Sequence, residues 1–92
     1  MKHDATSMTL WMLMARYKGA PFIPAETVCE DFFQPLSYSR FLHKVESGEI
    51  NLPLVRMDDS RKTPKYLALE DLALFLDSKH EAAVREATAI AS

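Results

Sequence analysis

The stretch PAETVCEDFFQPLSYSRFLHKVESG, residues 24–48, is the most informative about the fold, because it holds two helical patterns on either side of a short break. The first pattern is an apolar stripe at the spacing i, i+3, i+4, i+7, i+8, formed by Ala25, Val28, Cys29, Phe32 and Phe33. Pro35 then disfavours helical geometry at Gln34, and Ser37 can cap a second helix that runs to Gly48. The stretch therefore predicts two short helices joined by a tight turn.

The second of these helices has a polar side opposite its apolar residues. At about 100° per residue, that side collects five hydrogen-bond donors, namely Ser39, Arg40, His43, Lys44 and Ser47. Two short helices with a tight turn are typical of a helix-turn-helix, whose second helix enters the DNA major groove. An ordinary solvated helix face explains the same residues, so this pattern alone leaves both interpretations open.

A hairpin is predicted directly after these helices. The short apolar-rich runs LPLVRM (52–57) and KYLAL (65–69) flank the polar segment DDSRKTP, residues 58–64, which is typical of a long hairpin tip. A hairpin after a recognition helix is a wing, and its basic residues, here Arg56, Arg61, Lys62 and Lys65, would lie along the phosphates. Asp58 and Asp59 weaken the local field, and a plain solvent-exposed turn is the alternative.

Apolar and helical patterns also occupy both ends of the chain. Residues 8–17, MTLWMLMARY, predict a helix capped by Ser7 or Thr9, with a strand as the weaker alternative. Glu70 and Asp71 favour the start of a last helix that extends as far as residue 88, with one stripe formed by Leu72, Phe75, Leu76, Lys79 and Ala83. Its alanine-rich end either frays or contacts another subunit.

The first helix offers more apolar surface than one small domain can cover. We therefore predict an oligomer interface, of a homodimer or a higher oligomer, formed by Met8, Leu10, Trp11, Met12, Leu13 and Met14. The alternative is that Trp11 and its neighbours complete the core of the monomer.

Composition favours one small domain and a binding function. The 92 residues are 48% hydrophobic and 26% charged, and their net charge is −2. Residues 40–66 hold six basic and four acidic residues, a net +2, whereas the rest of the chain holds five basic and nine acidic, a net −4. A polyanion suits that basic middle.

Enzymatic and metal chemistry are not expected. Cys29 is a lone cysteine on an apolar helix face, and the three histidines, His3, His43 and His80, lie far apart in the sequence. The chain has no Gly-rich phosphate loop, no HExxH and no GxSxG, so we expect neither an enzyme nor a cofactor. Without a secretion signal or a membrane span, a cytoplasmic location is expected.

Two longer segments carry a family resemblance. LMARYKGAPFIPAETVCEDFF (13–33) and GEINLPLVRMDDSRKTPKYLALEDLALFLD (48–77) resemble the pyocin activator protein (PrtN) family of phage-related transcriptional regulators, over roughly residues 8–78. The resemblance implies an activator that recognises promoter-proximal DNA in a prophage or bacteriocin cluster. It also places Arg56, Ser60 and Lys62 at the positions of the family's wing motif. The same elements resemble phage excisionases, which bend DNA.

Together these patterns predict an α+β, mainly α protein: an excisionase-like winged helix-turn-helix with an N-terminal apolar helix and a long C-terminal helix. We expect an N-terminal extension (1–7), a DNA-binding domain (8–80) and a helical tail (81–92). The expected partners are double-stranded DNA, a second copy of the chain and RNA polymerase, in the nucleoid of a bacterial cell. Two alternatives stay open, an architectural DNA-bending protein and a winged-helix interaction module without DNA binding.

Overall fold

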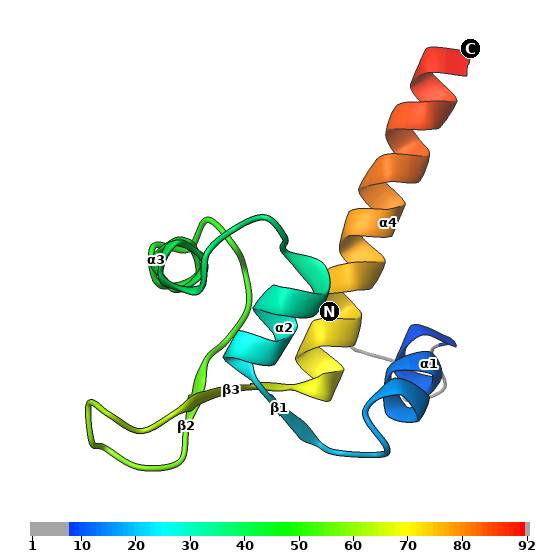
Figure 1. Ribbon diagram of the computed structural model, residues 1–92. Helices are drawn as coiled ribbons and strands as arrows, with labels where there is room; N and C mark the ends of the chain where they lie inside the picture. The colour runs from blue at the N-terminus through cyan, green and yellow to red at the C-terminus, as the bar shows by residue number, and fades with distance from the viewer. Residues whose placement is uncertain (1–7, 92) are drawn as a thin grey trace.

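The computed structural model describes residues 8–91, which form four helices and a small sheet (Figure 1). The elements in chain order are α1 (Met8–Arg16), β1 (Phe22–Pro24), α2 (Ala25–Phe32), α3 (Tyr38–Glu46), β2 (Val55–Arg56), β3 (Lys65–Ala68) and α4 (Leu69–Ala91). The predicted α+β, mainly helical class is confirmed, and the arrangement is consistent with a winged helix-turn-helix. The predicted extension 1–7, with His3 and the candidate cap Ser7, and the terminal Ser92 lie outside the described residues.

The two helices predicted in residues 24–48 are present as α2 and α3. Ser37 caps α3 as expected, because its hydroxyl accepts a hydrogen bond from the Arg40 backbone N–H at 3.3 Å. The turn between the helices contains a cis peptide bond at Gln34–Pro35. Phe33, in that turn, packs its ring against Phe41 of α3 at 4.8 Å and against Phe75 of α4 at 5.8 Å. These ring contacts hold the turn and α3 on the rest of the domain.

The sheet contains one strand that the sequence analysis missed. Its order is β1-β3-β2, and both pairs are antiparallel. The predicted hairpin is confirmed, with Val55 opposite Tyr66, but β2 has only two residues instead of the expected six. The missed strand β1 pairs Ile23 with Leu67, so the hairpin is anchored to the segment that leads into α2.

A single core lies between the helices and the sheet, and it draws on all four helices. Phe41, Leu67 and Leu72, from α3, β3 and α4, are fully buried, as is Val28 of α2. Helix α1 packs on α4, and the Thr9 hydroxyl donates a hydrogen bond to Asp77 Oδ1 at 2.5 Å. The core therefore fixes α3 and the hairpin to one rigid body.

The predicted oligomer interface needs a correction at two positions. Leu10 and Leu13 are only 6% and 5% exposed, because α1 turns that side toward α4 and the core. They belong to the chain's own core and are unavailable to a second subunit. Met14 is half-buried against the same core. Met8, Trp11 and Met12 remain exposed, with Trp11 at 53% and Met12 at 61%.

A polar cluster ties the end of α1 to α2. Arg16 forms an ion pair with Asp31 Oδ2 at 3.2 Å, and the Tyr17 hydroxyl donates a hydrogen bond to the same oxygen. The hydrogen bond from Tyr17 and the nearby Arg16 lower the pKa of Asp31, although its partial burial opposes this. Burial, followed by the hydrogen bond to Asp31, raises the pKa of Tyr17.

Helix α4 runs to Ala91, three residues beyond the expected end, and crosses the boundary predicted after residue 80. Residues 78–91 are all exposed, and this half of the helix projects away from the body of the domain (Figure 1). The projection accounts for the elongated dimensions of 51 × 28 × 24 Å. Within residues 8–91, no helix combines the length and the apolar character needed to cross a membrane.

Candidate nucleic-acid interface

The predicted recognition face of α3 is exposed as one continuous surface. Four of its residues, Ser39, Arg40, His43 and Lys44, line a shallow hollow together with Glu49. Their common orientation follows from the helical period, because Phe41 and Val45 are buried on the other side of α3. Ser47, the fifth predicted residue, is the C-cap of the helix and is also exposed. The burial pattern thus separates an apolar anchoring side from a polar outer side.

The hairpin tip lies next to this helix. Arg61, Lys62 and Lys65 border a second hollow whose other walls include Tyr38 and Leu42 of α3. Glu26 of α2 is the acidic residue on that border. In Figure 1 the hairpin and α3 lie on the same side of the domain, whereas α1 and the projecting α4 lie on the other. Two segments separated in the sequence, both carrying basic residues, therefore lie next to each other on one side of the domain.

Ser60 shapes the tip of the hairpin. Its hydroxyl accepts a hydrogen bond from the Lys62 backbone N–H at 3.2 Å, and its carbonyl accepts one from Thr63 N–H at 3.2 Å. These bonds form a local turn of the kind that serine favours. Ser60 consequently supports the backbone that carries Arg61 and Lys62.

The basic residues of this surface differ in whether a carboxylate already holds them. Lys44 Nζ lies 2.7 Å from Glu49 Oε2, and Arg56 Nη2 lies 3.8 Å from Glu46 Oε2. Among residues 8–91, no ion pair involves the other four basic residues of the surface, which are Arg40, Arg61, Lys62 and Lys65. The hydrogen bond from Lys44 and the charge of that ammonium lower the pKa of Glu49. This carboxylate is therefore fully ionised near neutral pH.

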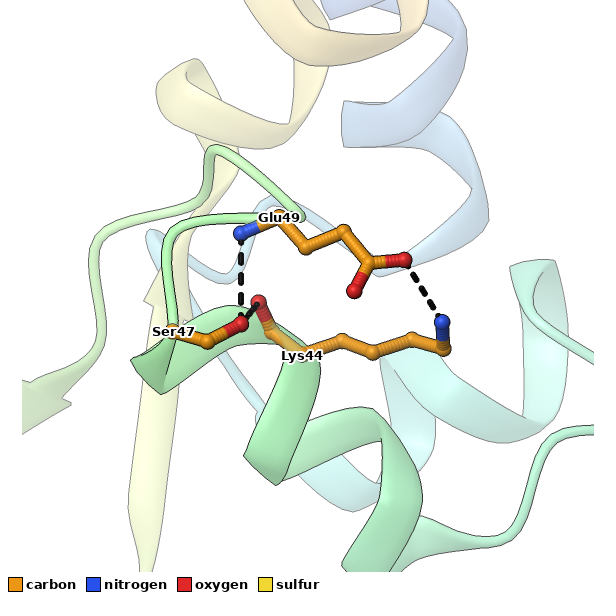
Figure 2. A network of polar contacts seen from close by, with 3 residues as sticks. All are labelled: Lys44, Ser47 and Glu49. Carbon is orange, nitrogen blue, oxygen red and sulfur yellow. Dashed lines mark hydrogen bonds and ion pairs between the residues drawn. The ribbon is translucent and has the colours of Figure 1, made fainter.

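Glu49 reaches Lys44 because the chain reverses after α3 (Figure 2). Gly48 has a φ of +87°, a left-handed conformation that favours glycine at a helix end. The Ser47 hydroxyl donates to the Lys44 carbonyl at 3.1 Å and accepts from Glu49 N–H at 3.4 Å. The Lys44 carbonyl also accepts from Ile50 N–H at 3.0 Å. Four polar contacts thus fold the turn back onto the helix face.

The sequence analysis missed this role of Glu49. A spacing of five residues is not a helical pair, and the helix-pair rules cover only three and four. The signal for this contact is Gly48, which the sequence pattern marks as the end of the helix. When a helix ends at a left-handed glycine, the chain reverses direction there. The residue after the glycine can then lie beside the last turn of the helix.

Other reactive groups do not add to this surface. Cys29 is buried, as predicted, and its thiol donates a hydrogen bond to the Leu36 carbonyl at 3.4 Å. Burial, and then the charges of Glu30 and Glu26, raise the pKa of this thiol, so it stays protonated and unreactive. In the part of the chain that the structure describes, no three His, Cys, Asp or Glu side chains gather as a metal site.

The comparisons with known proteins agree with the resemblance noted in the sequence. A family model described as pyocin activator protein PrtN matches residues 9–83. No curated protein and no solved structure matches the chain. The matched range begins at the second residue of α1 and includes the sheet, α2, α3 and more than half of α4. Because the match extends over most of the chain, the protein belongs to the pyocin activator protein PrtN family.

Proposed function

We propose that the protein is a sequence-specific DNA-binding transcriptional activator of prophage or bacteriocin-type genes. In this proposal α2 and α3 act as a helix-turn-helix and the β2–β3 hairpin acts as its wing. The observation that carries the proposal is the position of the basic residues. The polar face of α3 borders one hollow, and the tip of the hairpin borders a second hollow whose other walls include Tyr38 and Leu42 of the same helix. Membership in a family of activators supports the regulatory role.

The two halves of α3 would have different tasks. Base edges are read chiefly by the N-terminal residues of a recognition helix, which here are Ser39 and Arg40. Arginine is well suited to this because it can donate two hydrogen bonds to one guanine. His43, Lys44 and Ser47 lie further toward the C-terminal end, where donors meet phosphates.

The wing would supply phosphate contacts. Arg61 and Lys62 are exposed at its tip, Lys65 and Arg56 stand at its base, and Ser60 holds the turn. Phosphate contacts carry no sequence information, but they fix the register of the protein on the duplex. This division gives α3 the specificity and the wing much of the affinity.

We further propose that the protein binds DNA as a homodimer, or as a higher oligomer, through the outer side of α1. Met8, Trp11 and Met12 remain exposed there, and aromatic and methionine side chains are enriched in interfaces. A two-fold dimer would place two copies of α3 on a palindromic site. Activation would then involve contact with RNA polymerase, in the bacterial cytoplasm.

Selection of tight-binding duplexes from a random-sequence library tests the proposal. We expect a preferred sequence to be enriched, and we expect Arg40→Ala to weaken binding to it by about 1–3 kcal/mol and relax the preference. Arg85→Ala, which removes an exposed arginine from the projecting end of α4, is the matched control. It should retain the wild-type affinity and the wild-type sequence preference.

Three results would contradict the proposal. Failure of the wild type to bind any duplex would favour a protein-interaction module. Unchanged binding by a folded Arg40→Ala, Lys44→Ala double variant would exclude the α3 face. Strong bending of the selected duplex in a circular-permutation assay would favour an excisionase-type architectural role.

A further inference from the structure

Glu49 lies on the proposed DNA-binding surface and is paired there with Lys44. Its carboxylate lies 2.7 Å from the Lys44 ammonium, the distance expected of a charge-assisted hydrogen bond (Figure 2). Glu49 also lines the same hollow as Ser39, Arg40, His43 and Lys44. The outer face of α3 therefore carries an anion of its own among its basic and polar residues.

We propose that Glu49 is an internal counter-anion that competes with DNA phosphate for Lys44 and so lowers the affinity of the protein for DNA of any sequence. This inference rests on the proposed function. Carboxylate and phosphate oxygens both accept ammonium protons, and the Glu49 carboxylate already balances the charge of Lys44, so Lys44 gains less from pairing with a phosphate.

The backbone around Gly48 makes this competition effective. Hydrogen bonds from Ser47 to the Lys44 carbonyl, and from Glu49 N–H to Ser47, hold the turn against the last turn of α3. When Lys44 turns to a phosphate, the held turn keeps residue Glu49, and with it a negative charge, near the same end of α3. Two anions then lie close together, which opposes binding in addition to the loss of the ion pair.

The pair has little value for the stability of the fold. The side chains of Lys44 and Glu49 are 31% and 64% exposed, and ion pairs at such positions contribute little to folding free energy. The second pair on this surface, between Arg56 and Glu46, is longer at 3.8 Å and lies in no shared hollow with the α3 face. Of the two ion pairs on this surface, the Lys44–Glu49 pair therefore has the shorter distance, and it is the one that lies on the polar face of α3.

The test is the Glu49→Gln substitution in the full chain, measured by fluorescence anisotropy. The probes are a fluorescein-labelled random-sequence duplex and the duplex that the wild type selects from a library. We expect Glu49→Gln to bind both duplexes more tightly by a similar factor, about twofold to tenfold. The freed Lys44 should also steepen the plot of log K against log salt by about 0.9.

Two control variants separate this mechanism from a general effect of charge. Glu86→Gln changes the net charge equally, but it lies on the exposed, projecting half of α4. It should leave affinity and salt slope near the wild-type values. In a Lys44→Met background, Glu49→Gln should give no gain, because the cation that it releases is absent. Circular dichroism verifies that each variant is folded.

The possible outcomes distinguish the two proposals. A wild type that binds neither duplex overturns the proposed function and this inference with it. A wild type that binds, with an unchanged Glu49→Gln variant, overturns the inference alone. It is also overturned if Glu86→Gln gives the same gain, or if the gain persists in Lys44→Met. A gain that depends on Lys44 supports it.

Discussion

The dependence of DNA binding on salt can be worked out from the basic residues on the proposed surface. Each phosphate that the protein neutralises contributes about −0.9 to the slope of log K against log salt. Arg40, Arg61, Lys62 and Lys65 form no ion pair within residues 8–91, whereas carboxylates hold Lys44 and Arg56. On a random-sequence duplex, where all of these residues would meet phosphate, we expect four to six contacts per chain and a slope of roughly −3.6 to −5.4.

That slope predicts a large change over an accessible range of salt. Raising the concentration from about 50 to about 200 mM should weaken binding by roughly 150-fold to 1,800-fold per chain. Replacing both Arg61 and Lys62 with alanine removes two contacts, so the slope should become shallower by about 1.8. Because these contacts carry no sequence information, the selected duplex and the random duplex should be weakened equally.

Anisotropy titrations at four or more salt concentrations measure both quantities, with Arg85→Ala as the control. A folded Arg61→Ala, Lys62→Ala variant that keeps the wild-type slope would exclude phosphate contacts by the wing. The hairpin would then be a solvent-exposed turn. A selective loss of the preferred sequence would also contradict the prediction, since that would assign base reading to the wing.

Further predictions concern the core, the oligomer, the polar cluster and the turn. Leu13→Ala should lower the free energy of unfolding by about 2–5 kcal/mol in urea titrations, whereas Met12→Glu should leave it nearly unchanged and yield monomers in sedimentation. A wild type that is already monomeric at micromolar concentration would contradict the α1 interface. Asp31→Asn should lower the melting temperature at pH 7. The difference from wild type should vanish as the pH falls below about 4, because a carboxylate with a lowered pKa stabilises the fold only while it is ionised. Gly48→Ala should cost about 1–2 kcal/mol, which thermal unfolding would detect, since alanine is strained at a φ of +87°.

The helices and the hairpin were predictable because their signals are local. Ser37 needs only the neighbouring Arg40 N–H to act as a cap, and the stripe of α3 follows from its own period. The end of α4 was less predictable, since the alanine-rich segment after residue 78 has no stop signal before Ala91. Helix propensity favours alanine without fixing where the helix ends.

The features that the sequence did not predict depend on contacts outside the local period of a helix or a strand. β1 has three residues and ends at Pro24, so the segment looks like a break; it is a strand because Ile23 meets Leu67. Similarly, α1 is apolar on every side, and only its packing on α4 separates buried Leu10 and Leu13 from exposed Trp11. The Glu49 contact needs the chain reversal at Gly48. The spacing of apolar and polar residues along the chain does not predict the β1–β3 pairing, the packing of α1 on α4 or the Lys44–Glu49 pair.

The arrangement of charge also explains how an acidic protein would approach a polyanion. The net charge of the chain is −2, and α4 alone holds five acidic and two basic residues, a net −3. Its projecting half points away from α3 and the hairpin, which carry the basic residues (Figure 1). That projecting half, residues 78–91, is itself neutral, with two acidic and two basic residues, so the acidic excess of α4 lies at Glu70, Asp71 and Asp77 in the packed half. Under the proposed function, the attraction to DNA therefore comes from the basic residues of α3 and the wing, and it acts at close range. Glu49, which lines the hollow on the α3 face, cancels part of that attraction.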